Sequence, residues 1–257
     1  MKEKLEKVIE NIKEKTKKES YSIKLLEEKP GILDSKIGGI PYMPKDKSYP
    51  RTKEGELMPL FVQINLEEII LENYPLKGIL QLFVDKEFDY PPQYEVRYYE
   101  KIEDEYVTDL PTINLSQFVV SESIKIKLTP YTTFMTLGDF RFEEIFLKSF
   151  NEIFDTKVED CFKIDEVTGI ENSFDIVYEE LQSEKGLIGG YADFTQTDPR
   201  KYDEKLKDYT ECLIKIDSCI DMDKIMIGDA GIAWLLITTE DLKAKRFEKA
   251  VFDWDCC

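Results

Sequence analysis

The chain contains no histidine among its 257 residues. Without an imidazole, a Ser-His-Asp or Cys-His nucleophilic site, a histidine-ligated zinc and a histidine general base are all excluded. Acid–base chemistry would have to use Asp, Glu, Lys, Tyr or Cys, with a side-chain pKa shifted by burial. We also find no nucleophile motif and no phosphate-binding loop. The sequence therefore favours a protein without catalytic activity but does not exclude an enzyme.

Long apolar runs are missing as well. No stretch of about 18 apolar residues occurs, so we expect no membrane span. The N-terminal segment "MKEKLEKVIENIKEKTKKES" lacks the apolar core and the cleavage site of a secretory signal. The five cysteines are an odd number, which is typical of free thiols in a reducing cytosol. We therefore expect a cytoplasmic protein.

Positive charge is scarce relative to negative charge. The chain has 35 Lys and Arg against 53 Asp and Glu, a formal net charge of −18. Such a field repels phosphate backbones and anionic lipid, so we expect no nucleic-acid and no membrane partner. A protein partner with a basic surface fits this charge better. Apolar residues make up 42% of the chain, which is enough for a packed core.

The periodicity predicts helices and strands that are mixed without strict alternation. Apolar residues at helical spacing predict helices over 3–18, 141–154, 173–183 and, more briefly, 64–73, where Leu66, Ile69 and Ile70 would face inward. Short β-rich runs lie at 21–26, 60–65, 78–84, 95–100, 124–128, 212–216, 231–237 and 249–254. This pattern predicts an α+β fold with a mainly antiparallel β core, an N-terminal helix and a helical connector at about 141–184.

Four segments recur in the same order about 150 residues apart. "GGIPYMPKDKSYPR" matches "GGYADFTQTDPR", "LFVQIN" matches "CLIKID", "GILQLFV" matches "GIAWLLI", and "EVRYYE" matches "KAVFDW". The offsets are 151, 152, 153 and then 153 or 154. We interpret them as two pseudo-symmetric repeats, at about 21–128 and 185–257, within a single domain over 1–257. The Gly-Gly pairs would supply positive φ and a close chain approach.

The same motifs resemble a known family. "SKIGGIPYMP", "LFVQINLEE", "KGILQLFVD", "IGGYADFTQTDPR", "IGDAGIAWLLI" and the terminal "DWDC" are similar to the YwqG-type family of bacterial proteins. The resemblance covers about residues 30–257. It implies an α+β fold dominated by antiparallel strands, a cytoplasmic setting and no assigned reaction. Ala192, Tyr49 and Ile227 depart from the family pattern, in which proline or tryptophan is common there, and this disfavours an aromatic clamp.

Residues found in only one repeat are the best candidates for function. Asp193, Gln196, Asp198 and Asp229 are private to the second repeat, and Arg200 follows the same proline as Arg51 in the first. If their loops meet, the acids could bind a divalent cation or run acid–base chemistry. Arg51 and Arg200 could bracket an anionic ligand. Asx-turns and an Arg200–Asp ion pair are the structural alternative. No EF-hand spacing is present, and we predict neither a metal nor a cofactor.

These observations leave three classes of function open. The first is a binding or interaction protein without catalysis, for example one that engages a basic protein partner. The second is a small-molecule or divalent-cation site in the second repeat, with a carboxylate-based hydrolase as its catalytic version. The third is a thiol sensor at Cys256 and Cys257.

Overall fold

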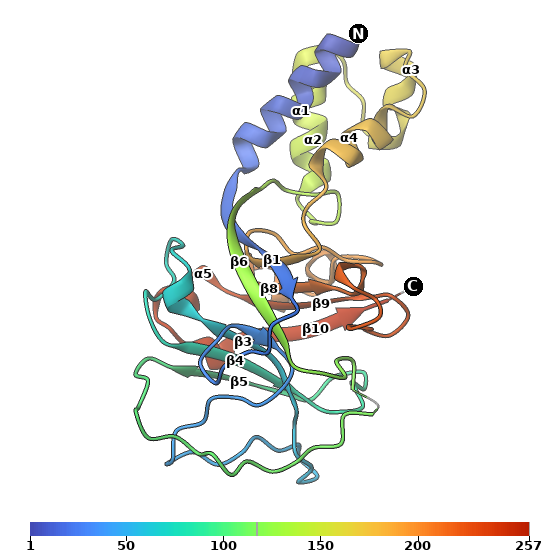
Figure 1. Cartoon of the computed structure of the whole chain (residues 1–257). Helices are drawn as coiled ribbons and strands as arrows, with labels where there is room; N and C mark the ends of the chain where they lie inside the picture. Colours follow the sequence, from blue (N-terminus) through green and yellow to red (C-terminus); the bar gives the residue numbers. More distant parts are fainter. Residues whose placement is uncertain (117, 257) are drawn as a thin grey trace.

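Ten strands form one antiparallel sheet in the order β10-β9-β8-β7-β1-β6-β2-β3-β4-β5 (Figure 1). The computed structural model describes residues 1–116 and 118–256. The strands are β1 (Lys18–Leu26), β2 (Lys36–Ile37), β3 (Leu60–Asn65), β4 (Ile79–Val84), β5 (Tyr94–Tyr99), β6 (Ile124–Thr133), β7 (Gly186–Gly189), β8 (Glu211–Asp217), β9 (Ile232–Ile237) and β10 (Val251–Asp255). The α+β prediction with a mainly antiparallel core is confirmed.

The two ends of the sheet bend toward each other around one large apolar core. The ring of Tyr94 on β5 lies 5.7 Å from that of Phe252 on β10, although these strands stand at opposite ends of the strand order. Phe252 also packs edge-to-face on Phe61 of β3 and on Phe88, at 6.0 and 5.7 Å. Aromatic pairs of this geometry contribute beyond the area they bury. The core therefore joins residues from both halves of the chain.

The strand order is symmetric about its centre. β1 and β6 are the central pair, and β7 to β10 follow on one side as β2 to β5 do on the other. Both arms carry a shift in register at the same place, between Leu60 and Val62 in β3 and between Cys212 and Ile214 in β8.

The helices project from one side of the sheet (Figure 1). They are α1 (Lys2–Thr16), α2 (Phe142–Phe154), α3 (Ile164–Thr168) and α4 (Ser173–Leu181), and a fifth, α5 (Thr239–Lys243), lies beside the sheet. Leu5, Val8, Ile9 and Ile12 of α1 are buried in a second core with α2 and α4. The predicted N-terminal helix and the helical segment are therefore confirmed. None of the helices in the described ranges is long and apolar enough to cross a lipid bilayer.

The helix predicted over 64–73 is wrong. Only a single 3-10 turn, Leu66–Glu68, follows β3, and Ile69 is already extended. Ile70 is 74% exposed instead of facing inward, and its backbone N–H donates to the Tyr21 hydroxyl of β1. This hydrogen bond to β1, a strand distant in the sequence, holds the segment extended. The tertiary contact thus outweighs the helix preference that the local apolar spacing predicts. The short strands β2 and β7 were not predicted either.

Five more 3-10 turns connect the elements: Cys161–Lys163, Pro199–Lys201, Glu204–Leu206, Ser218–Ile220 and Phe247–Lys249.

Candidate functional site

The candidate loop at 190–201 lies against the turn at 136–141, which joins the sheet to α2. In the loop, Asp198 accepts from Arg200 through both carboxylate oxygens, at 2.9 Å from Nε and 2.7 Å from Nη2. Arg200 Nη2 also lies 3.2 Å from Asp139 Oδ2 in the turn. All three side chains are almost fully buried. This ion-pair cluster ties the loop to the helical part of the molecule.

Asp139 is the centre of that cluster, and sequence reasoning missed it. Arg141 donates to both of its oxygens, at 2.7 and 2.6 Å. Burial alone would raise the pKa of Asp139, but the Arg141 hydrogen bonds and the charges of Arg200 and Arg141 outweigh it and hold this pKa below its ordinary value. Asp139 is therefore held as a carboxylate, and both acids are fully engaged by protein donors, an arrangement suited to holding a loop in place.

Asp193 also contacts the turn at 136–141. Its Oδ1 accepts from the Thr136 hydroxyl at 3.3 Å and from the Phe194 N–H at 3.2 Å. A Cβ added at Gly138 would lie 2.5 Å from this oxygen, so a glycine is needed for the close approach. The structure thus brings Asp193, Asp198 and Arg200 together around the turn.

Asp229 and Arg51 lie apart from this cluster. Asp229 is exposed beside Gly228, and no hydrogen bond or ion pair joins it to another residue in the described part of the chain. Arg51 is exposed and donates to the Gly55 carbonyl at 2.6 Å, within its own hairpin. Arg200 donates to Asp198, to Asp139 and to the Tyr209 carbonyl. Its guanidinium is therefore already engaged within the protein, which counts against two arginines bracketing one ligand.

Gln196 is exposed and marks the rim of a cleft between the loop and the helices. Its side chain donates to the Cys256 carbonyl at 2.8 Å, and its backbone N–H donates to Asp255. The cleft has a volume of about 220 Å³ and is lined on the helical side by Glu143, Cys161, Phe162 and Phe174. We call it the neck cleft. It is the place where the predicted loop borders an open surface.

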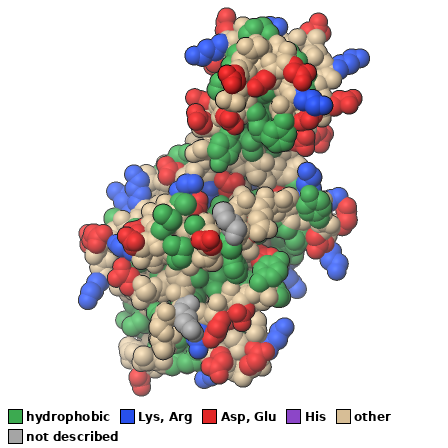
Figure 2. All heavy atoms as spheres, turned by 90° about the vertical axis from the view of Figure 1, so that its right-hand side faces the viewer, with side chains coloured by type: hydrophobic (Ala, Val, Ile, Leu, Met, Phe, Trp, Pro, Cys, Tyr) green, Lys and Arg blue, Asp and Glu red, His purple; other side chains and the backbone are tan. Residues whose placement is uncertain are grey.

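The neck cleft adjoins a strongly acidic segment. Residues 142–181, from the start of α2 to the end of α4, carry twelve Asp and Glu against three Lys, a net charge of −9. This is half of the net charge of the whole chain. Figure 2 shows red acidic side chains around green hydrophobic patches on the helical part.

No group of three or more Asp, Glu or Cys side chains within residues 1–116 and 118–256 is placed to hold a metal ion. In the second half of the chain, Asp193 and Asp198 are occupied by protein donors. The geometry thus gives no support to a carboxylate site shared by Asp193, Asp198 and Asp229.

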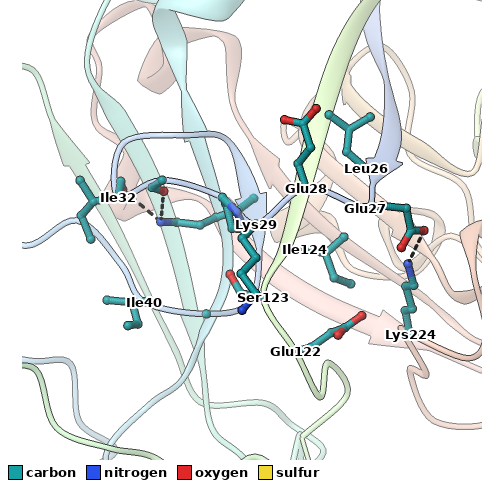
Figure 3. Close-up of a pocket in the computed structure, with 14 residues that line it drawn as sticks. Leu26, Glu27, Glu28, Lys29, Ile32, Ile40, Glu122, Ser123, Ile124 and Lys224 are labelled. Carbon is teal, nitrogen blue, oxygen red and sulfur yellow. Dashed lines mark hydrogen bonds and ion pairs between the residues drawn. The ribbon is translucent and has the colours of Figure 1, made fainter.

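A larger pocket of about 540 Å³ lies in the first half of the chain, near the ends of β1 and β2 and the start of β6 (Figure 3). Figure 3 shows the paired Glu27 and Lys224 at one side and Ile32 and Ile40 at the other. Lys29 and Ser123 lie between them. The lining charges balance, so the pocket does not select strongly for either sign.

Lys36 is the unusual residue of this pocket. Its ammonium donates to the Gly31 and Ile32 carbonyls at 2.9 and 3.0 Å, and the side chain is almost fully buried. Burial lowers its pKa to about 8, although Asp34 opposes the shift. Nothing in the local sequence pattern distinguished Lys36 from the many surface lysines.

Among the described residues, the cysteines do not form a cluster. Cys161 and Cys212 are buried and free, and Cys256 is partly exposed and free. Cys257, the other half of the predicted sensor, lies outside the described residues.

Comparison with known proteins places this chain in a family but not in a pathway. No curated protein matches the sequence. The family described as Domain of unknown function (DUF1963) matches residues 35–256. That range includes nine of the ten strands, the neck cleft and half of the residues that line the pocket of Figure 3. With most of its length covered, the chain belongs to the DUF1963 family, a domain of unknown function.

Proposed function

We propose that this chain is a cytoplasmic binding protein without catalytic activity, and that its helical part docks a protein partner with a basic, partly apolar surface. The observation that carries the proposal is the acidic segment 142–181, which combines a net charge of −9 with exposed aromatic rings.

Most acids of this segment are available to a partner. Of its twelve carboxylates, only Glu152 and Glu180 form ion pairs in the described part of the structure, with Lys15 and Lys13 of α1. The exposed acids include Glu144, Glu159, Glu166, Glu171, Asp175 and Glu179. Facing charges of opposite sign steer association and disfavour wrong partners, so this surface favours a Lys- or Arg-rich partner.

Aromatic side chains supply the apolar part of the surface. Phe162 is 76% exposed and packs 5.0 Å from Phe174, and Tyr178 lies one helical turn beyond Phe174 and is 49% exposed. Residues four apart share a face of a helix, so Phe174 and Tyr178 continue the stripe that Phe162 begins. Aromatic anchors commonly carry most of the energy of an interface.

A defined pair of peptides tests this proposal. A labelled amphipathic Lys/Leu helix and its Glu/Leu counterpart are titrated with the protein, and binding is followed by fluorescence anisotropy. We expect the basic peptide alone to bind, and Glu166→Lys/Glu179→Lys to weaken it by about tenfold or more. Asp104→Lys/Asp109→Lys is the matched control, because it makes the same charge change at exposed acids outside the helices. Equal losses in both variants would show that only the overall charge matters and would end the proposal of a specific surface.

We further propose that the two halves of the sheet descend from one duplicated unit, with repeats at about 21–128 and 185–257 in a single domain. The support is the mirrored strand order, the matching register shifts and the positive φ values at Gly38, Gly39, Gly189 and Gly190. On this interpretation, the pairs Tyr99–Ile79 and Asp255–Ile232 would align β5 with β10 at an offset of 156, instead of the 153 or 154 of the sequence match. The narrower YwqG-type assignment is a proposal of the same kind and rests on the shared motifs.

A small-molecule site is the second candidate function, because the pocket of Figure 3 is large enough for a metabolite and contains the buried Lys36. A ligand-specific rise in melting temperature that Lys36→Met removes would support it.

A further inference from the structure

A second hollow lies on the other side of Gln196 and Thr197 from the neck cleft. Its volume is about 370 Å³, and it opens at the edge of β10, the last strand of the sheet. Gln196 and Thr197 line both spaces, so they form a ridge between them. The proposed docking surface on the helices does not include this hollow.

Three aromatic side chains line the hollow: Tyr90, Trp234 and Trp254. The rings of Tyr90 and Trp254 meet edge-to-face at 6.4 Å, and Tyr90 is 74% exposed. Trp234 is held in place by Phe194, whose ring lies 4.7 Å away. The faces of such rings carry partial negative charge and attract cations.

A carboxylate without a cation lines the same hollow. Asp253 pairs across the strands with Trp234, so the two side chains share one face of the sheet. The carboxylate accepts only from the backbone N–H of Trp254, at 2.9 Å, and it forms no ion pair with any described residue. Burial, and to a lesser degree the neighbouring Asp255, raises the pKa of Asp253. A bound cation would relieve both effects.

The other polar groups of the hollow limit what it can bind. Asp255 is occupied by the N–H groups of Thr195 and Gln196, at 3.0 and 2.9 Å. The indole N–H of Trp254 is buried and has no acceptor among the described atoms. One free carboxylate beside three rings is a poor cage for a hard metal ion, which takes six or more oxygens. It suits an organic cation, whose alkyl groups contact the rings.

We propose that this hollow is a binding site for an alkylammonium group, with Asp253 as its counter-ion and Tyr90, Trp234 and Trp254 as its walls. Two sources share that chemistry, a free quaternary or protonated amine and a lysine side chain on a partner protein.

The two tryptophans of the chain both line this hollow, so their fluorescence reports directly on occupancy. Choline and 3,3-dimethylbutanol, its neutral isostere, are titrated separately into the full chain, and a lysine amide with an acetylated α-amine represents the partner source. We expect a saturable change with one of the cations and none with the isostere. Tighter binding of choline would identify the ligand of the hollow as a free amine. Tighter binding of the lysine derivative would identify it as a lysine side chain of a partner protein.

Asp253→Asn tests the counter-ion with little change of shape. We expect it to weaken cation binding about tenfold or more, whereas Asp104→Asn leaves binding unchanged. Equal responses to choline and its isostere, no saturable response to either cation, or unchanged binding in Asp253→Asn would each overturn the proposal. Glu166→Lys/Glu179→Lys, which disables the proposed docking surface, should leave choline binding intact, so the two proposals can fail separately.

Discussion

Arg200 and Asp198 form a bidentate ion pair within one turn of chain, and only 1% and 2% of their surfaces are exposed. Asp139, which lies 59 residues before Asp198 in the sequence, completes the cluster through the same guanidinium. The charge of Arg200 thus compensates two buried carboxylates at once. A buried acid that loses its only compensation is costly, so the cluster couples the loop, the turn and α2 to the stability of the fold.

We therefore expect Arg200→Met to lower the free energy of unfolding by about 3–5 kcal/mol, because it leaves Asp198 uncompensated and Asp139 with Arg141 alone. Urea denaturation followed by circular dichroism measures the change. Arg51→Met is the matched control, since Arg51 is exposed, and we expect it to cost less than about 0.5 kcal/mol. Similar costs for the two variants would mean that the buried cluster contributes no more than a surface contact.

The sequence located part of this cluster but could not complete it. Asp198 stood out because it has no counterpart in the matching loop of the first half, and Arg200 because it follows the same proline as Arg51. Asp139 did not, because its partner is set by how α2 meets the sheet and not by local spacing. Asp229 had the same local signal as Asp193 but lies elsewhere. Local sequence patterns thus identified the candidate site residues, whereas tertiary contacts determine which of them lie together in the fold.

The fold is likewise predicted by local sequence patterns in some elements and decided by tertiary contacts in others. α1 follows from the helical spacing of its apolar residues, and strands such as β4 and β9 follow from continuous apolar runs, since they are buried at every residue. β2 has two residues and β7 has four, too few for a periodic signal. The segment after β3 was misassigned as a helix because Tyr21, a residue of another strand, holds it extended.

The buried Lys36 gives a stability change at alkaline pH. Its folded-state pKa of about 8 lies below its ordinary value of 10.5, so between these values the unfolded chain binds more protons. The free energy of unfolding contributed by this group should therefore rise with pH across that window, by at most about 1.4 kcal/mol per pH unit. Urea denaturation from pH 7 to 9.5, compared with Lys36→Met, isolates the effect. Parallel curves for the two proteins would contradict it.

The thiol-sensor hypothesis predicts an order of reactivity. Burial raises the pKa of Cys212 to about 11 and also raises that of Cys161, so both should resist alkylation in the native state. Cys256 is partly exposed and should react before Cys161 and Cys212. A timed iodoacetamide pulse at pH 8, read by peptide mass spectrometry, measures the order. The Cys257→Ser background keeps the neighbouring thiol from obscuring it, and an inert Cys256 would end the hypothesis.

The double glycine at 189–190 should tolerate substitution poorly, and comparison with Gly55 separates the two physical reasons. Gly190 and Gly55 both have positive φ, +78° and +93°, so alanine is conformationally strained at either. At Gly190 the new Cβ would also lie 2.6 Å from the Thr133 hydroxyl of β6, whereas at Gly55 it would meet nothing within 4 Å. Gly55→Ala should cost about 1 kcal/mol and Gly190→Ala clearly more, measured by the same urea transition. Because only the close approach differs between them, equal costs would show that the Gly-Gly pair serves backbone conformation alone and that β6 can yield to a side chain there.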